Sequence, residues 1–279
     1  MSEADRSLAA LNMRLESELQ RRRVVGAGSH GERVTFSHRR IEGVDCFGAP
    51  AGGGFGTRVL GFGLFAPSSE RLLDRIRRHY AAAGQACQVI VANGAADRGT
   101  TPLLRRSGFA EQWVGAGHAL VVGDRAEALT RRWAGLLGQP GVDTGIAGPR
   151  ELALWELLSR QGFGQRGHWA IYSRVTARAL RAHSRSMGAF IGWADGTPAA
   201  SAALLLREQA GLLFSGSVLK RHRGRGLQPA LIAARLWHGL RRGAQAFFSQ
   251  SSVDGPSAQN LHDAGFGQRW TFSFWSKDD

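Results

Sequence analysis

Hydrophobic residues in the first half of the chain follow helical spacing in some stretches and strand-like alternation in others. A helical stripe predicts an amphipathic helix over residues 7–23, with apolar positions at Leu8, Leu11, Leu15 and Leu19. Alternating stretches predict antiparallel strands at residues 33–37, 41–47 and 57–65. A helix capped by Ser68 or Ser69 and stopped by Gly84 then precedes a strand at residues 87–92. This half therefore predicts a sheet flanked by helices.

The second half repeats this order of elements. Three predicted strands, at residues 188–193, 199–207 and 211–218, form a meander whose first turn spans residues 195–198. A helix over residues 227–242 ends at Gly243 and leads into a strand at residues 245–250. A short helix at residues 257–264 and a closing strand follow. Each half thus predicts a mixed, mostly antiparallel sheet with helices around it.

The two halves also match in their spacing. Gly84 stands 25 residues before Phe109, and Gly243 stands 23 residues before Phe266, with a short helix and a glycine before each phenylalanine. At 279 residues, the chain is long enough for two domains of ordinary size. We therefore predict a tandem duplication: a first domain at residues 1–123, a connector at residues 124–140 and a second domain at residues 141–279.

The chain carries a formal charge of +14, and Lys220 and Lys277 are the only lysines among its 36 basic residues. Codon bias explains the preference for arginine but not the excess of positive charge, which favours an anionic ligand. The short arginine runs have few aromatic neighbours, so we do not expect a nucleic-acid partner. The sequence leaves the oligomeric state open.

Cysteine content and hydropathy exclude several classes of protein. Cys46 and Cys87 are too few and too isolated for a disulfide framework or a zinc site, so we expect no metal. No stretch approaches the ~20 apolar residues of a membrane span, and the N-terminus has no apolar signal core. We expect a cytoplasmic protein without a membrane partner.

Residues 218–228 join the third strand of the second half to its long helix. Gly224 and Gly226 stand just before the helix, where glycines let an anion approach the unpaired N–H groups and the positive end of the helix dipole. The surrounding basic residues are Lys220, Arg221, Arg223 and Arg225. These features predict a phosphate-binding turn. A solvated surface cluster would show the same charges, so the order of the surrounding elements must decide between the two.

This order, with a strand, an Arg-x-x-Gly turn, an amphipathic helix, a strand and a short helix ending in Gly-Phe, resembles the GNAT acyltransferase superfamily. The pyrophosphate-loop pattern of the family falls on Arg223, Gly226 and Gln228, where Gln228 replaces a small residue. Residues 257–266 resemble the coenzyme-side helix, with Asn260 facing the pantetheine arm. The resemblance implies an α/β (α+β) fold of two tandem GNAT-like domains, with acetyl-CoA as the co-substrate.

The resemblance also assigns the coenzyme contacts. They would come from Val218, Leu219, Arg223, Gly224, Arg225, Gly226, Leu227, Gln228 and Asn260. A backbone N–H near Val218 or Leu219 would polarise the thioester carbonyl while an acceptor amine attacks it directly. The family's usual tyrosine acid would fall at Leu261. The candidate groups for proton transfer are therefore His262, Ser215 and Ser217, with water as the alternative.

The first half lacks the phosphate-binding turn. Residues 65–69 contain neither glycine nor arginine where the turn would stand. We therefore interpret residues 1–123 as a degenerate copy that binds no coenzyme and that supports the second domain or shapes the acceptor site. Residues 162–167 fit a dinucleotide-binding pattern, but they follow a predicted helix rather than a strand, which argues against that function.

The leading hypothesis is an N-acetyltransferase that moves an acetyl group from acetyl-CoA to a small-molecule or protein amine. One alternative keeps the fold but transfers an aminoacyl or longer acyl group. Another is a non-catalytic sensor that only binds the coenzyme, which the leucine at the tyrosine position would suit.

Overall fold

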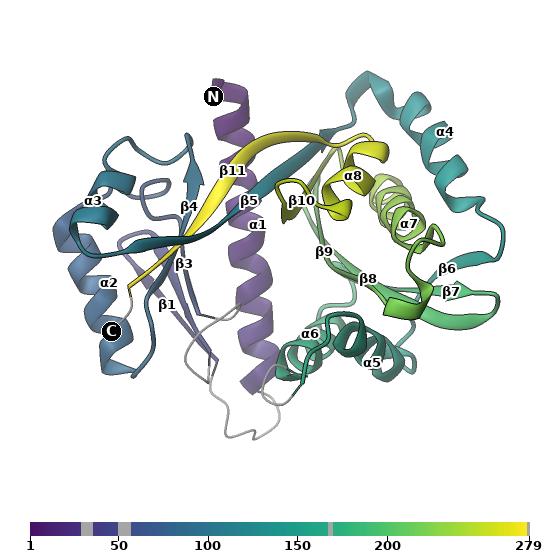
Figure 1. Ribbon diagram of the computed structural model, residues 1–279, viewed down its shortest axis with the longest axis horizontal. Helices are drawn as coiled ribbons and strands as arrows, with labels where there is room; N and C mark the ends of the chain where they lie inside the picture. Colours follow the sequence, from purple (N-terminus) through teal and green to yellow (C-terminus); the bar gives the residue numbers. More distant parts are fainter. Residues whose placement is uncertain (29–35, 50–56, 167–169, 278–279) are drawn as a thin grey trace. The chain divides into compact units, whose positions relative to one another are not determined.

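The computed structural model describes residues 1–28, 36–49, 57–166 and 170–277 (Figure 1). The chain divides into two compact units: Met1–Gly117 with Arg269–Asp279, called unit 1, and His118–Gln268, called unit 2. Most of the strand predicted at residues 33–37 lies outside the described residues. Within the described part of the chain, no helix combines the length and apolar character that crossing a membrane requires.

Unit 1 is built around a mixed sheet. Strands β1, β2 and β3 pair antiparallel in that order, β3 runs parallel to β4, and β4 pairs antiparallel with β11. The elements are α1 (Glu3–Gly28), β1 (Ser37–Ile41), β2 (Val44–Gly48), β3 (Arg58–Leu60), α2 (Glu70–Ala82), β4 (Gln88–Asn93), α3 (Thr100–Arg106), the first part of β5 (Ala110–Val121) and most of β11 (Gly267–Ser276).

Helix α2 connects the parallel pair β3 and β4 and packs on the sheet through one face. Its buried residues, Leu72, Leu73, Ile76 and Tyr80, recur at helical spacing. The hydroxyl of Tyr80 donates to the carbonyl oxygens of Phe47 and Arg58, at 3.0 and 3.1 Å. Strand β3 is shorter than predicted because Gly61 and Gly63, with φ of +96° and +72°, turn the chain out of extended conformation.

In unit 2, strands β6, β7, β8 and β9 pair antiparallel in chain order, and β10 runs parallel to β9. Helices α4 and α7 cover one face, and α5 and α6 cover the other (Figure 1). The elements are η1 (Gly123–Arg125), α4 (Ala126–Leu137), β6 (Val142–Ile146), α5 (Leu152–Gly162), α6 (Ala170–Ala182), β7 (Met187–Ala194), β8 (Thr197–Arg207), β9 (Ala210–Val218), η3 (Lys220–His222), α7 (Leu227–Arg241), β10 (Ala246–Ser252) and α8 (Pro256–Asp263).

The predicted fold class is confirmed, because each unit has a mixed, mostly antiparallel sheet with helices around it. The predicted elements of the second half agree with the observed ones closely: α7 begins at the predicted Leu227 and ends one residue before the predicted Arg242. Both halves also place a long helix between two parallel strands, α2 between β3 and β4 and α7 between β9 and β10.

The compact units differ from the expected domain boundaries at two places. The expected connector, residues 124–140, is mostly helix α4, whose Leu129 and Trp133 are buried in the core of unit 2. The indole N–H of Trp133 donates to the carbonyl oxygen of Ala264 at 3.0 Å. The closing strand β11 pairs with β4, from Thr271 opposite Asn93 to Ser276 opposite Gln88, and most of it belongs to unit 1.

Candidate coenzyme site

The predicted phosphate-binding turn joins the end of β9 to the first residue of α7 in unit 2. Gly224 and Gly226 have φ of +78° and +80°, in the left-handed region that glycine adopts without strain. Gly226 is the N-cap of α7, and no side chain of the described residues caps this helix end. Pro229 in the first turn has no N–H. The uncapped N–H groups therefore belong to residues 226–228, where an anion could accept hydrogen bonds from them.

The basic side chains of the turn have different partners. Arg225 forms an ion pair with Asp195, in the turn between β7 and β8. Arg223 donates to two carbonyl oxygens of the protein, Val218 at 3.3 Å and Gly162 at 3.4 Å. Lys220 and Arg221 are exposed to solvent. Two of the four predicted cations thus hold the turn itself together, and two remain on its solvent-exposed side.

The backbone favours a register of the loop pattern two residues earlier than the predicted one. Read from Arg221, the pattern Arg-x-x-Gly-x-Gly falls on Gly224 and Gly226 without any departure. These are the two glycines of the turn with positive φ, and the helix starts directly after the second. Gln228 then lies in the first turn of the helix. The predicted contact set did not include Arg221, although the glycine spacing already contained the signal.

Strand β9 carries an irregularity just before the turn. Its register with β8 pairs Phe214 with Ala203 and Ser217 with Ser201, so β9 has one residue more than β8 between these pairs. Ser215 lies in this extra stretch with φ of +48°, as expected for a β-bulge. Because a bulge disrupts the regular hydrogen bonding of a strand, it can leave backbone groups of β9 directed toward a ligand.

Helix α7 supports this bulge with two side chains. A Cβ atom on Gly216 would stand 2.9 Å from Nε2 of Gln228, so the amide of Gln228 packs against the bulge. The amide oxygen of Gln228 is buried and accepts no hydrogen bond from the described residues. Arg235 is 2% exposed and donates to the carbonyl oxygens of Leu231, Ala203 and Phe214. Burial lowers the pKa of Arg235 to about 9, which still leaves it charged at neutral pH.

The backbone N–H groups of Val218 and Leu219, at the end of β9, point in different directions. The N–H of Leu219 donates to the carbonyl oxygen of Ala199 at 2.9 Å, within the sheet. Successive N–H groups of a strand point to opposite sides, so the N–H of Val218 points away from β8. Strand β10 pairs with β9 only from Ala246–Phe248 opposite Ala210–Leu212, well before Val218. Val218 is therefore the better candidate for polarising a carbonyl.

The predicted groups for proton transfer on β9 lie in different surroundings. The hydroxyl of Ser217 is buried and lies 3.1 Å from that of Ser201. A Cβ atom on Gly162, at the end of α5, would stand 2.5 Å from the same hydroxyl, so this first glycine of residues 162–167 packs directly on the strand. Ser215 is partly buried in the bulge. Gly167 lies outside the described residues.

Helix α8 carries the remaining predicted residues. Asn260 is partly exposed, whereas Leu261, at the position of the family's tyrosine, is 3% exposed and belongs to the core of unit 2. His262 is exposed, with Nδ1 3.7 Å from a carboxylate oxygen of Asp263. The position of the family's acid therefore carries no titratable group, and the neighbouring histidine faces solvent.

The corresponding helix start in unit 1 has a different chemistry. Ser69 is the N-cap of α2, and its hydroxyl accepts a hydrogen bond from the N–H of Leu72 at 3.2 Å. The N-terminus of α2 is thus capped by a side chain of the protein, whereas the N-terminus of α7 has no such cap among the described residues. This difference agrees with the sequence prediction that the first half lacks the turn.

Comparison with known proteins identifies the fold. Solved structures similar to this chain include a GCN5-related N-acetyltransferase from Kribbella flavida, at 16% identity and a TM-score of 0.64, over 94% of this chain and 95% of that one. A tandem GNAT protein from the clavulanic acid biosynthesis pathway matches at 18% identity and a TM-score of 0.62, over 91% of this chain and 86% of that one. A GCN5-related N-acetyltransferase from Sphaerobacter thermophilus matches at 11% identity and a TM-score of 0.59, over 85% and 80% of the two chains.

Neither a scan against protein-family models nor a search of curated protein sequences finds a match. The structural likenesses, at low identity, show the fold alone. The chain has the fold of the GNAT superfamily in its tandem form, which confirms the resemblance seen in the sequence.

Proposed function

We propose that this protein is an acetyl-CoA-dependent N-acetyltransferase whose coenzyme binds to unit 2. The observation that carries the proposal is the start of α7, where two glycines in left-handed conformation precede a helix end that no described side chain caps. In a GNAT fold, this turn stands where the resemblance places the pyrophosphate of the coenzyme. The net charge of +14 also favours an anionic ligand.

Residues of the turn and of the first turn of α7 suit two parts of the coenzyme, the pyrophosphate and the pantetheine arm. The N–H groups at residues 226–228 would bind the pyrophosphate, and the exposed Lys220 and Arg221 would add charge-assisted contacts. The buried amide oxygen of Gln228 could accept a hydrogen bond from one of the amide N–H groups of the pantetheine arm. Asn260 on α8 remains a further candidate for that arm.

The chemistry would be direct attack of the acceptor amine on the thioester carbonyl that acetyl-CoA supplies. The N–H of Val218 would donate to the carbonyl oxygen and stabilise the negative charge that develops there. The Ser217 hydroxyl is already paired with Ser201, so Ser215, His262 or water would have to take up the proton. The acceptor would be a small-molecule or protein amine.

Calorimetric titration of the protein with acetyl-CoA tests the proposal, together with the variant Gly226→Asp. A carboxylate at the N-cap would repel the pyrophosphate, so binding should fall to an undetectable level. The control for backbone strain is Gly243→Asp, at the opposite end of α7, because Gly243 has positive φ, at +87°, as Gly226 has. Wild-type protein that does not bind acetyl-CoA, or equal binding by the two variants, would contradict the proposal.

One observation supports a second candidate, a sensor that binds the coenzyme without transferring its acetyl group. Leu261 replaces the usual tyrosine and is buried in the core, so it offers no proton to a leaving thiolate. An assay of thiol release from acetyl-CoA and from longer acyl-CoAs, across a panel of amines, separates the two candidates. Release above the uncatalysed rate supports the transferase, and binding without release supports the sensor.

A further inference from the structure

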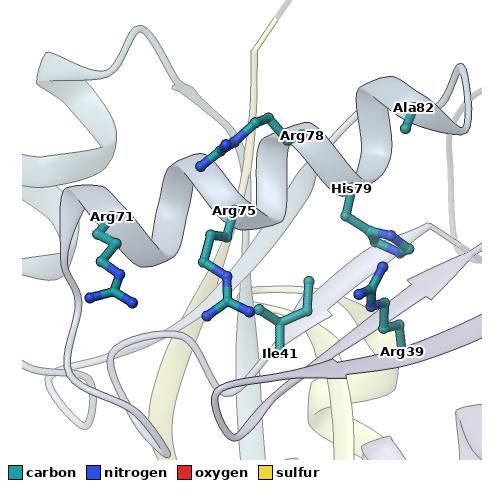
Figure 2. Close-up of a pocket in the computed structure, with 7 residues that line it drawn as sticks. All are labelled: Arg39, Ile41, Arg71, Arg75, Arg78, His79 and Ala82. Carbon is teal, nitrogen blue, oxygen red and sulfur yellow. The ribbon is translucent and has the colours of Figure 1, made fainter.

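A basic pocket in unit 1 lies outside the proposed coenzyme site. Its volume is about 530 Å³, and strand β1 and helix α2 form its two walls (Figure 2). In Figure 2, Arg71 and Arg75 extend from α2 on the side of Ile41, and Arg39 points from β1 toward His79. The lining residues are Arg39 and Ile41 from β1, with Arg71, Arg75, Arg78, His79 and Ala82 from α2.

The pocket arginines of α2 are separated by four and three residues along the helix. In Figure 2, the guanidinium groups of Arg71 and Arg75 lie on the side of Ile41, and that of Arg78 lies along the upper edge of the helix. Like charges at this spacing destabilise a helix, and the buried face of α2 is formed by other residues. On α2 itself, Asp74 stands three residues after Arg71 and four before Arg78, and its carboxylate forms an ion pair with Arg77 at 3.4 Å. One carboxylate thus stands among several arginines, so the helix keeps an excess of positive charge.

The protein supplies little compensating negative charge. Arg75 forms an ion pair with Glu42, at the turn between β1 and β2. Arg78 donates to the backbone carbonyl oxygen of Asp74 at 3.4 Å. Among the described residues, no ion pair joins a carboxylate to Arg39, Arg71 or Arg78, and no acidic residue lines the pocket. Burial, and secondarily the charge of Arg39, lower the pKa of His79, which is the direction that a positive potential in the pocket produces.

The chemistry of the lining restricts the ligand. Guanidinium groups bind phosphate oxygens through paired N–H donors, and here they approach from two walls. The volume lies within the range of ~300–1,000 Å³ typical of small-molecule pockets, and exceeds the need of a single inorganic anion. Ile41 and Ala82 add an apolar surface for an uncharged part of the ligand. We propose that this pocket binds a small organic polyphosphate, independently of the coenzyme site in unit 2.

Two charge-matched double variants of the full chain test this proposal. Arg39→Gln with Arg78→Gln removes one guanidinium from each wall of the pocket. The control, Arg40→Gln with Arg77→Gln, changes the adjacent residue on each element, neither of which lines the pocket. Calorimetric titrations with ATP and with inositol hexakisphosphate measure the binding. Loss of two charge-assisted contacts should raise the Kd about tenfold or more in the first variant, and leave the control within about twofold.

Three further measurements make the outcome decisive. Thermal unfolding of both double variants confirms that they fold, as expected because none of the four side chains is buried. The Gly226→Asp variant should bind the polyphosphates as the wild type does, since the pocket shares no residue with the coenzyme turn. A single-stranded oligonucleotide and anionic lipid vesicles serve as competing anions.

Several results would overturn the inference. These are the absence of saturable polyphosphate binding, equal weakening in the two double variants, and binding that depends on Gly226 but not on Arg39 and Arg78. Tighter binding of the oligonucleotide or the vesicles through Arg39 and Arg78 would assign the surface to a macromolecule instead.

Discussion

The guanidinium of Arg235 donates a hydrogen bond to the carbonyl oxygen of Phe214, at 3.4 Å, across the space between α7 and β9. The same nitrogen donates to the carbonyl oxygen of Ala203, at 3.3 Å, which is the residue paired with Phe214. Both carbonyls belong to the last regular pair before the bulge at Ser215. Helix α7, which begins at the predicted phosphate-binding turn, therefore also supports the bulged end of β9 that leads into the turn.

Replacing Arg235 with methionine should destabilise the protein and weaken acetyl-CoA binding. The substitution removes the charged donor from the buried carbonyl oxygen of Ala203 and from the partly buried one of Phe214, and a buried group left unsatisfied costs about 1–3 kcal/mol. Urea denaturation measures the free energy of unfolding, and calorimetry measures the Kd. Arg241→Met, on an exposed position of the same helix, should change neither quantity. Equal stability of the two variants would mean that Arg235 does not support the bulge.

Alanine at Gly226 should be more harmful than alanine at Gly224. Both positions have positive φ, which costs an alanine about 1–2 kcal/mol. At Gly226 the added Cβ would also stand 3.2 Å from Cγ of Gln139, whereas at Gly224 it would meet open space. Thermal unfolding should therefore show a larger loss for Gly226→Ala, and acetyl-CoA titration should show weaker binding. A larger effect at Gly224 would place the critical contact elsewhere in the turn.

Removal of the cap of α2 should weaken unit 1. The Ser69 hydroxyl accepts a hydrogen bond from the N–H of Leu72, and loss of such a cap costs about 1 kcal/mol. Hydrogen exchange in Ser69→Ala should accelerate at the first turn of α2 and leave α7 unchanged. Ser107→Ala, at the C-terminal end of α3, is the control because it removes no N-cap. Unchanged exchange in α2 would argue against the capping bond.

Acidification should destabilise unit 2 through His118. Its Nε2 lies 2.9 Å from the hydroxyl of Ser251, and burial lowers the pKa of His118. The unfolded chain therefore binds the proton more readily than the folded one, so stability decreases as pH falls below the unfolded pKa of about 6.5.

The variant His118→Gln isolates the contribution of His118. The pKa values of His79 and His238 are also lowered, but both histidines are present in the variant and in the wild type, so their effects cancel in the comparison. Urea denaturation at about pH 7.5 and about pH 5 should show a smaller difference in unfolding free energy between variant and wild type at the lower pH. A difference that is independent of pH would exclude His118 as the source.

Trp133 should be essential to unit 2 although it lies in the expected connector. Its side chain is fully buried and bonded to Ala264, so Trp133→Ala should lower the free energy of unfolding by about 3–5 kcal/mol. Leu136 offers a comparison on the same helix. It is only partly buried, so Leu136→Ala should lower the free energy of unfolding by less than Trp133→Ala does. Urea denaturation of both variants measures the two losses. Equal losses at both positions would indicate that α4 packs loosely.

Local patterns in the sequence determined much of the fold and part of the site. The spacing of Leu72, Leu73, Ile76 and Tyr80 is sufficient to define the buried face of α2, because helical periodicity depends only on neighbouring residues. Gly224 and Gly226 likewise marked the turn, since glycine alone adopts its left-handed conformation without strain. The sequence also contained the choice of Arg221 over Arg223, because Gly224 and Gly226 follow Arg221 at the spacing of the loop pattern and the predicted helix begins at residue 227.

Tertiary structure decided which segments belong together. The closing strand β11 pairs with β4, although Thr271 and Asn93 stand far apart in the chain, because a strand can bond to any edge of suitable register. The sequence gives no sign of the role of Arg235, which is one of two arginines in α7. Only the folded chain places it beside the bulge. The sequence alone therefore determined the elements and the turn, and long-range pairing and burial decided the boundaries of the units and the support of the site.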